Sequence, residues 1–259
     1  MYRIIFALIF ILSVSVNAQN NAVSAGEKLV FTASYNISGI LTDIAQVTME
    51  TSEVKTSKAT LLRLKCTAAT YSKWDNFFKI RDLYESYVSP KSLTPYLYKR
   101  NINEGSYFKT MKYTFSSKTN TVKTVQTKKK KDGGTWDENK DVNIGSGTKD
   151  IVSTLYYLRT LDFQNMSVGN SKTATIIFDR EEVKTHFTFL GKESIETNIG
   201  SKECYKLSIS ASKSDILKGN NSNLIWLTAD ENRIPVLAKF KIPVGNGELK
   251  IKSASGLRN

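Results

Sequence analysis

The chain has 259 residues and a formal net charge of +13, and it is 40% hydrophobic, 10% aromatic and 24% charged. This composition excludes a disordered tail, a collagen-like chain and a polytopic membrane protein. The single histidine excludes most zinc and non-haem iron sites, and we expect neither a metal nor a cofactor. A chain of this length can bury a hydrophobic core large enough for a stable fold without a bound metal ion or cofactor.

The first eighteen residues have the pattern of a secretory signal peptide. A positive charge at Arg3 precedes a mostly apolar run over 4–16, and Ala18 supplies a small residue for cleavage before Gln19. The run is shorter than the roughly 20 residues that cross a bilayer. We therefore expect a cleaved signal over 1–18 and one β-rich domain over 19–259. The mature protein is then a monomer that does not span a membrane, exported to the periplasm or the extracellular space.

Most of the mature chain alternates between apolar and polar residues, which is typical of antiparallel strands with one buried face. Clear examples are Leu29–Ile37, Ala45–Glu50, Leu62–Ala68, Met111–Ser116, Val183–Phe189, Tyr205–Ala211 and Val236–Ile242. Turn signals rich in glycine, asparagine and aspartate separate these runs. The pattern predicts about a dozen strands, which are too many for a flat open sheet.

Two segments depart from the alternation. Apolar residues over Asp150–Arg159 follow the spacing of an amphipathic helix, with Asp150 as its N-cap, and we expect the main helix over 149–160. Within Tyr71–Lys79, three aromatic residues at helical spacing predict a short second helix. The stretch 128–149 has the weakest hydrophobic signal and is predicted to be a mobile loop before the main helix.

These elements predict a mainly β fold. We expect a strongly curved antiparallel sheet, a half-barrel or open barrel, with the main amphipathic helix on its concave side and one short helix. Two β sections joined around the helix are the competing arrangement.

The basic charge, mostly lysine, has its densest run at Lys128–Lys131. One interpretation is a solvated hairpin tip protected against edge pairing; the other is attraction to an anionic envelope surface. We expect no nucleic-acid binding, because arginine is scarce and no base-stacking motif is present. In the alternation of its predicted strand, Cys66 falls on the side of the apolar residues. Cys204 falls on the side of the polar residues of its own strand, and this difference argues against a disulfide between them.

No sequence motif for catalysis is present. A lone imidazole, His186, falls on the polar side of a predicted strand. Paired carboxylates such as Glu85 and Glu104 leave a glycan-active enzyme open as a third hypothesis. The aromatic residues suggest an apolar pocket in the mouth of the curved sheet, with core packing as the alternative. The residues assigned to that pocket are Trp74, Phe77, Phe78, Leu155, Tyr156 and Trp226.

Several stretches resemble a family of exported bacterial proteins of unknown function. The matching stretches are Gly26–Leu29, Arg81–Tyr87, Pro95–Gly105, Asp150–Arg159, Trp226–Asp230 and Ile234–Val236. The resemblance spans nearly the whole mature chain and implies a location and a fold but no activity. The tryptophan-containing strand and the proline-containing strand that follows it are also distantly similar to periplasmic lipoprotein carriers, whose half-barrels hold acyl chains.

The leading hypothesis is a non-enzymatic envelope protein that binds a lipid, a lipoprotein or another amphipathic ligand, with the main helix as plug or lid. The alternative is an assembly or structural factor of the envelope that uses a basic surface and has no ligand cavity.

Overall fold

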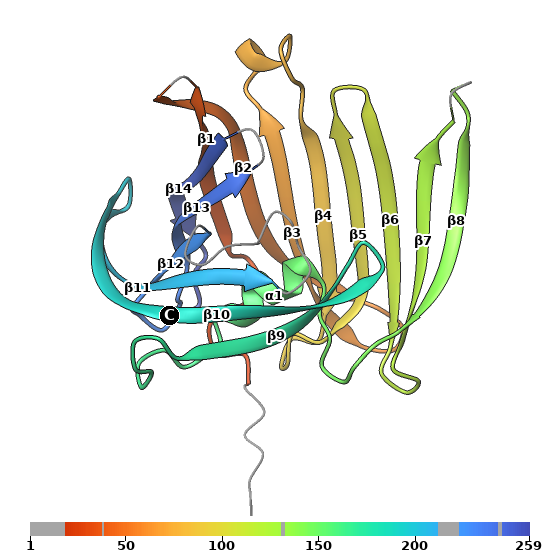
Figure 1. Cartoon of the computed structure of the whole chain (residues 1–259). Helices are drawn as coiled ribbons and strands as arrows, with labels where there is room; N and C mark the ends of the chain where they lie inside the picture. Colours follow the sequence, from red (N-terminus) through yellow and green to blue (C-terminus); the bar gives the residue numbers. More distant parts are fainter. Residues whose placement is uncertain (1–18, 38, 131–132, 212–222, 243–244) are drawn as a thin grey trace, which may run out of the picture.

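The computed structural model describes residues 19–37, 39–130, 133–211, 223–242 and 245–259. They form one antiparallel sheet of 14 strands with one α-helix and one 3-10 turn (Figure 1). The predicted mainly β architecture is confirmed, with 14 strands in place of about a dozen. The predicted signal segment, 1–18, lies outside the described residues.

The first eight strands form half of the sheet, which we call the wall. They are β1 (Lys28–Ile37), β2 (Ile40–Lys55), β3 (Thr60–Thr70), β4 (Arg81–Val88), β5 (Pro95–Glu104), β6 (Tyr107–Ser116), β7 (Thr121–Lys129) and β8 (Thr135–Asn143). Each strand pairs with the next one along the chain, so the wall is an uninterrupted meander. The 3-10 turn, η1 (Ser72–Trp74), lies between β3 and β4.

The last six strands form the second half, which we call the platform. They are β9 (Ser171–Phe178), β10 (Glu181–Thr197), β11 (Gly200–Ala211), β12 (Leu224–Thr228), β13 (Pro235–Ile242) and β14 (Gly245–Ser255). These strands form a second meander, and β14 then pairs with β1. The first and last strands therefore lie side by side inside the sheet, and β8 and β9 are its two edges within the described residues.

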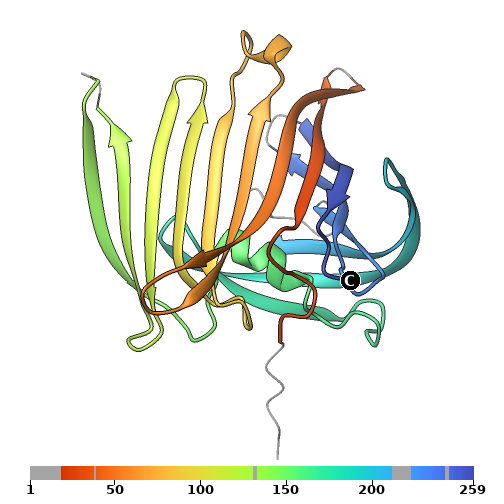
Figure 2. The ribbon, with the colours of Figure 1, turned by 180° about the vertical axis from the view of Figure 1, so that it is seen from behind.

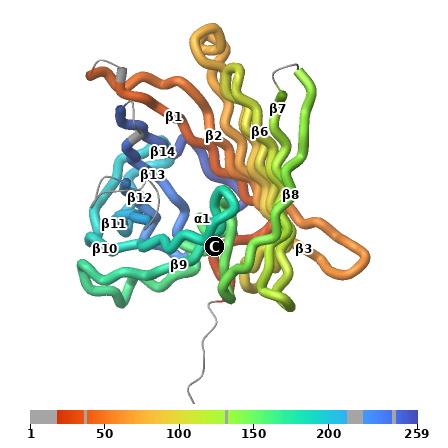
Figure 3. The backbone as a smooth tube through the Cα atoms, turned by 45° about the vertical axis from the view of Figure 1, so that its right-hand side comes forward, coloured from red at the N-terminus to blue at the C-terminus, as the bar shows by residue number. Residues whose placement is uncertain are grey.

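The sheet bends so that its two halves face each other across a helix. In Figures 1 and 2 the wall strands stand side by side, whereas β9, β10 and β11 run across the lower half of the wall. The helix α1 (Ile151–Leu158) contacts β3, β4 and β9 and lies in the angle between the halves, as Figure 3 also shows. The helix thus occupies the concave side of the bent sheet.

The wall face turned toward α1, which we call the inner face, carries the apolar residues of the alternation. A row of register partners across β3–β7 is buried on it: Leu64, Ser86, Tyr98, Tyr113 and Thr124. Because successive side chains of a strand point to opposite faces, the outer face holds most of the polar residues.

The platform is buried on both faces in its middle strands. Tyr205 and Leu227 pack in one core cluster with Leu158 of α1. Cys204 and Trp226 have the opposite parity and belong to the other core cluster. The sequence assigns Cys204 to the polar side of its strand, together with Lys206. The structure keeps Cys204 on that side but buries it in the cluster that contains Trp226.

The helix is fixed at both ends by buried polar groups. At the N-terminus, Asp150 forms a capping box with Ser153 and accepts a hydrogen bond of 2.6 Å from the Ser86 hydroxyl. At the C-terminus, the Arg159 guanidinium makes two contacts of 2.6 Å with the Glu27 carboxylate. Both side chains of this ion pair are fully buried. The helix predicted over 149–160 therefore forms, with Asp150 as its N-cap.

Half of the segment 128–149, predicted to be a loop, lies in strands. Lys128 and Lys129 end β7, and β8 pairs with β7 along its whole length. Nearly all side chains of β8 are exposed or half-buried. The strand is therefore held by backbone hydrogen bonds to β7, which leave no trace in the hydropathy of the sequence.

The short helix predicted within Tyr71–Lys79 is present only in part, as the 3-10 turn η1. The Trp74 carbonyl accepts hydrogen bonds from the amides of both Phe77 and Phe78, and the chain then enters β4. Phe77 and Phe78 are exposed, so no neighbouring layer is present to stabilise a longer amphipathic helix.

Candidate functional site

The six aromatic and aliphatic residues assigned to a pocket lie in three separate places. Tyr156 and Trp226 are buried in the same core cluster, where they serve as packing residues. Leu155 is half-buried on α1. The remaining three lie on the turn between β3 and β4, at the end of the wall away from α1: Trp74, Phe77 and Phe78 (Figure 1).

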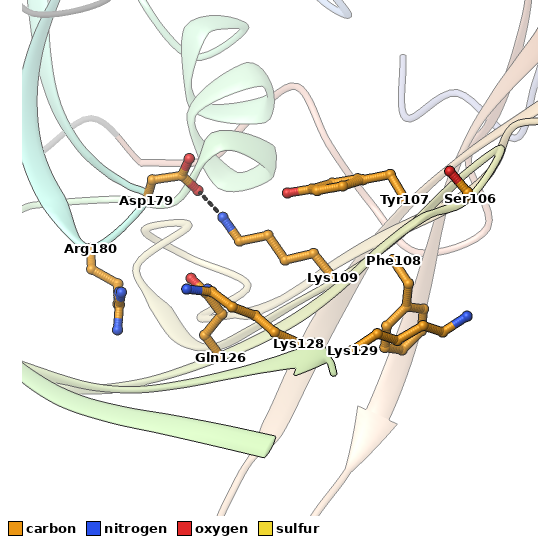
Figure 4. Close-up of a pocket in the computed structure, with 9 residues that line it drawn as sticks. All are labelled: Ser106, Tyr107, Phe108, Lys109, Gln126, Lys128, Lys129, Asp179 and Arg180. Carbon is orange, nitrogen blue, oxygen red and sulfur yellow. Dashed lines mark hydrogen bonds and ion pairs between the residues drawn. The ribbon is translucent and has the colours of Figure 1, made fainter. Parts of the chain in front are cut away.

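A groove of about 590 Å³ lies elsewhere, between the ends of β6 and β7 and the turn that joins β9 to β10 (Figure 4). Its lining residues are Ser106, Tyr107, Phe108, Lys109, Gln126, Lys128, Lys129, Asp179 and Arg180. Ligand pockets typically have volumes of about 300–1,000 Å³, so the groove is large enough for a small amphipathic molecule.

The β9–β10 turn that closes one side of the groove has a constrained backbone. Its two residues, Asp179 and Arg180, both have left-handed φ angles, of 44° and 69°. Such a two-residue turn matches the twist of a hairpin, but it usually contains glycine or asparagine. An arginine in this conformation is uncommon and requires support from its surroundings.

Side chains from the inner face of the wall provide this support. Arg100 and Lys109 form ion pairs with the Asp179 carboxylate, the latter at 3.2 Å. The Arg180 amide donates a hydrogen bond of 3.1 Å to the Tyr113 hydroxyl. The Arg180 guanidinium lies 2.7 Å from a Glu138 oxygen, so the turn is fastened to β5, β6 and β8. We call this set of contacts the clasp.

Positive charge predominates around the groove. Four cations, Arg100, Lys109, Lys128 and Arg180, surround two carboxylates, Asp179 and Glu138. Burial raises the pKa of Asp179, but Arg100 and Lys109 outweigh this effect and leave that pKa below its usual value. At Glu138, burial also raises the pKa, but hydrogen bonds and attraction from Lys128 and Arg180 outweigh this effect. The pKa of Glu138 is therefore lowered as well. Both carboxylates are therefore ionised at neutral pH, and the surplus of positive charge favours an anionic ligand.

Apolar side chains continue from the groove across the inner face of the wall. Ile102 is the register partner of Lys109 on β6, and Tyr84 is the partner of Arg100. Cys66 and Ala68, on β3, extend this surface toward β2. All four are half-buried, so a hydrocarbon chain placed here removes apolar surface from water.

The carboxylates considered for glycan hydrolysis do not form a suitable pair. Glu85 lies on the outer face of β4, where it pairs with Arg63, whereas the register places Glu104 on the inner face. Glu104 instead lies beside Asp82; burial and this neighbour raise the pKa of Glu104. Glu85 and Glu104 therefore lie on opposite faces of the sheet and do not flank a common space for a glycosidic bond.

Other chemical groups are dispersed. His186 is half-buried and lies 3.1 Å from the Thr173 hydroxyl across the β9–β10 pair. Cys66 and Cys204 are free thiols. Burial raises the pKa of Cys66 to about 12 and that of Cys204 to about 11, so neither is a reactive thiolate at neutral pH. Among the described residues, no cluster of histidine, cysteine, aspartate and glutamate is suited to a metal ion.

Sequence reasoning missed the groove because its residues come from distant parts of the chain. The sequence indicates the lysine run at 128–131 but not the groove beside it. The hairpin-tip interpretation agrees with the end of β7 at Lys129, whereas Lys131 lies outside the described residues. The short interruption at Asp179–Arg180, between two alternating segments, is a sequence signal for the turn. Nothing local indicates that this turn contacts Arg100 or Tyr113.

Within the described residues, the fold and the groove define a class of open, barrel-like β proteins with one internal helix and a groove lined mainly by basic side chains. A family model described as "Protein of unknown function (DUF3108)" matches residues 30–252, and the chain belongs to this family. The predicted resemblance to a family of unknown function is thus confirmed.

One similar solved structure is a β-barrel-like protein of the domain of unknown function DUF1849 from Brucella abortus. It is 9% identical, with a TM-score of 0.57, and the match covers 88% of this chain and 96% of that one. At this identity the likeness concerns the fold alone. No curated protein matches the sequence. Among the described residues, no helix has the length and apolar character needed to cross a membrane.

Proposed function

We propose that this chain is an exported, monomeric binding protein of the cell envelope, without enzymatic activity, whose half-barrel holds an amphipathic anion. The basic groove beside the β9–β10 turn is the observation that carries this proposal. The ligand class is an acyl chain with an acidic head group.

Different side chains of the groove bind the head group and the hydrocarbon chain of the proposed ligand. Lys109, Lys128 and Arg180 provide charge-assisted hydrogen bonds for a carboxylate or phosphate head group. The Tyr107 ring and the half-buried apolar side chains of β3–β5 receive the hydrocarbon chain. The clasp holds the turn in place, so little conformational entropy is lost when the ligand binds.

Binding of dansyl-undecanoate to the purified mature protein tests this proposal. We expect the dansyl fluorescence to increase on binding, and the methyl ester of the same probe to bind at least ten times more weakly because it lacks the charge. Lys128→Glu should weaken carboxylate binding at least tenfold, since it reverses one charge in the groove. Lys123→Glu is the matched control: it lies on the same strand, exposed on the outer face, and should bind as the wild type does.

Two results would contradict the proposal. A folded wild-type protein that takes up no probe would favour the alternative of an assembly factor without a ligand cavity. Equal losses in the Lys128→Glu and Lys123→Glu variants would show that binding depends on overall charge and not on the groove. Export is tested separately, by sequencing the N-terminus of the protein recovered from the envelope fraction, which should begin at Gln19.

A further inference from the structure

Four hairpin turns of the wall lie along one end of the sheet, which we call the rim (Figures 1 and 2). They join β1 to β2, β3 to β4, β5 to β6, and β7 to β8, because every second turn of a meander falls at the same end. The turns are also linked to one another. The Gly105 amide, in the β5–β6 turn, donates a hydrogen bond of 2.8 Å to the Lys79 carbonyl beside β4.

Large apolar side chains are exposed along this rim. The exposed fraction is 82% for Phe77 and 70% for Ile40, and Tyr107 and Trp136 are exposed on the neighbouring turns. The full set at the rim is Ile40, Leu41, Phe77, Phe78, Tyr107 and Trp136. Elsewhere in the described residues, only Tyr96 and Val168 are exposed large hydrophobic residues. An exposed concentration of this kind marks an interaction surface.

Lysines alternate with these aromatic residues. Lys73 lies 5.7 Å from the Trp74 ring and Lys128 lies 5.0 Å from the Trp136 ring. Further exposed lysines at the same end are Lys79, Lys129 and Lys130. The carboxylates of the rim turns are fewer, and Asp75 among them is paired with Arg81.

We propose that the rim docks on the surface of an anionic lipid bilayer. Aromatic side chains with nearby lysines are typical of the bilayer interface, where the rings lie among the head groups and the ammonium groups contact anionic phosphates. The groove opens beside the rim, since Tyr107 and Lys128 belong to both. The inference therefore rests on the proposed function and gives the ligand a direct route between bilayer and groove.

Cosedimentation of the mature protein with vesicles tests the docking. We compare vesicles of phosphatidylcholine alone with equimolar phosphatidylcholine and phosphatidylglycerol, and expect binding to the anionic vesicles at least tenfold tighter. Lys129→Gln/Lys130→Gln should weaken that binding roughly 30-fold, given the usual contribution of each lysine at such a surface. Phe77→Asp/Phe78→Asp should abolish it. Because these residues are exposed, we expect the variants to retain the wild-type unfolding midpoint.

Matched controls lie away from the rim. Tyr96→Asp/Val168→Asp removes the other two exposed apolar side chains, and Lys118→Gln/Lys123→Gln removes two exposed lysines of the wall. Both should bind anionic vesicles as the wild type does. Absence of vesicle binding, or equal losses in rim and control variants, would overturn the docking proposal. The dansyl-undecanoate assay contains no bilayer, so its outcome separates failure of the rim from failure of the groove.

Discussion

The wall and the platform are built from the same alternating strands but are covered differently. The wall is a single layer whose inner face is buried near α1 and half-buried toward the rim. The middle strands of the platform are buried on both faces, with Leu227 in one core cluster and Trp226 in the other. The platform, with both faces covered, supports the fold, whereas the partly open inner face of the wall provides a surface on which a ligand can bind.

The largest expected effect concerns the ion pair that connects the two halves. Glu27 directly precedes β1 of the wall, and Arg159 ends the helix that leads into the platform. Glu27→Ala leaves a buried guanidinium without its partner, and we expect the free energy of unfolding to fall by about 3–5 kcal/mol. Urea denaturation followed by circular dichroism measures this loss.

Glu50→Ala is the control for the ion pair. Glu50 contacts Lys28 at 3.1 Å on the outer face, where both side chains are partly exposed, and its removal should cost at most about 1 kcal/mol. A loss in Glu27→Ala no larger than this value would show that the two halves do not depend on the buried pair.

A second pair of variants compares the two halves directly. Leu227→Ala creates a cavity in the covered platform and should cost about 2–5 kcal/mol. Ile102→Ala, on the half-buried inner face of the wall, should cost about 1 kcal/mol and also weaken dansyl-undecanoate binding. Denaturant midpoints give both stabilities. If the Ile102 variant loses as much stability as the Leu227 variant, the inner face of the wall is packed as tightly as the platform, and the proposed difference between the two halves is wrong.

The smallest expected effect is the pH dependence associated with Glu104 on the wall. Burial and the neighbouring Asp82 raise its pKa in the folded state above the value of about 4.3 for an unfolded chain. Between these two values the folded protein holds more protons than the unfolded one, so this group lowers stability as the pH rises through the window.

Glu104→Gln removes this titration and should flatten that part of the pH profile. The measurement is the difference between the urea midpoints of the two proteins at several pH values from 4 upward. Parallel profiles would show that Glu104 does not titrate with a raised pKa in the folded protein.

The sequence predicts the wall better than it predicts the site. Alternation locates most strands, and Asp150 with the apolar spacing after it locates α1, because both are periodic and local. Strand β8 escaped prediction because its side chains are polar on both faces and only its backbone is paired. Cys204 lies on the side of its strand that the alternation indicates, but it is buried there, which a pattern with one solvent-exposed face does not represent.

The groove depends on contacts across long stretches of chain. Arg100 reaches Asp179 and Tyr113 reaches Arg180, and each pair is separated by more than sixty residues. No local pattern encodes such proximity, since it arises from the bend of the whole sheet. The rim is different: the three aromatic residues at 74, 77 and 78 were recognised as functional candidates, although the structure places them outside the groove.

The pairing of β1 with β14 makes the middle of the sheet the last part that a growing chain can complete. A truncated chain that ends before residue 245 has the unpaired backbones of β1 and β13 as two additional edges. Open edges of this kind recruit strands from other molecules and lead to aggregation. Premature termination, even of only the last fifteen residues, is therefore expected to yield insoluble material, and a circular permutant with β14 linked directly to β1 should escape this sensitivity.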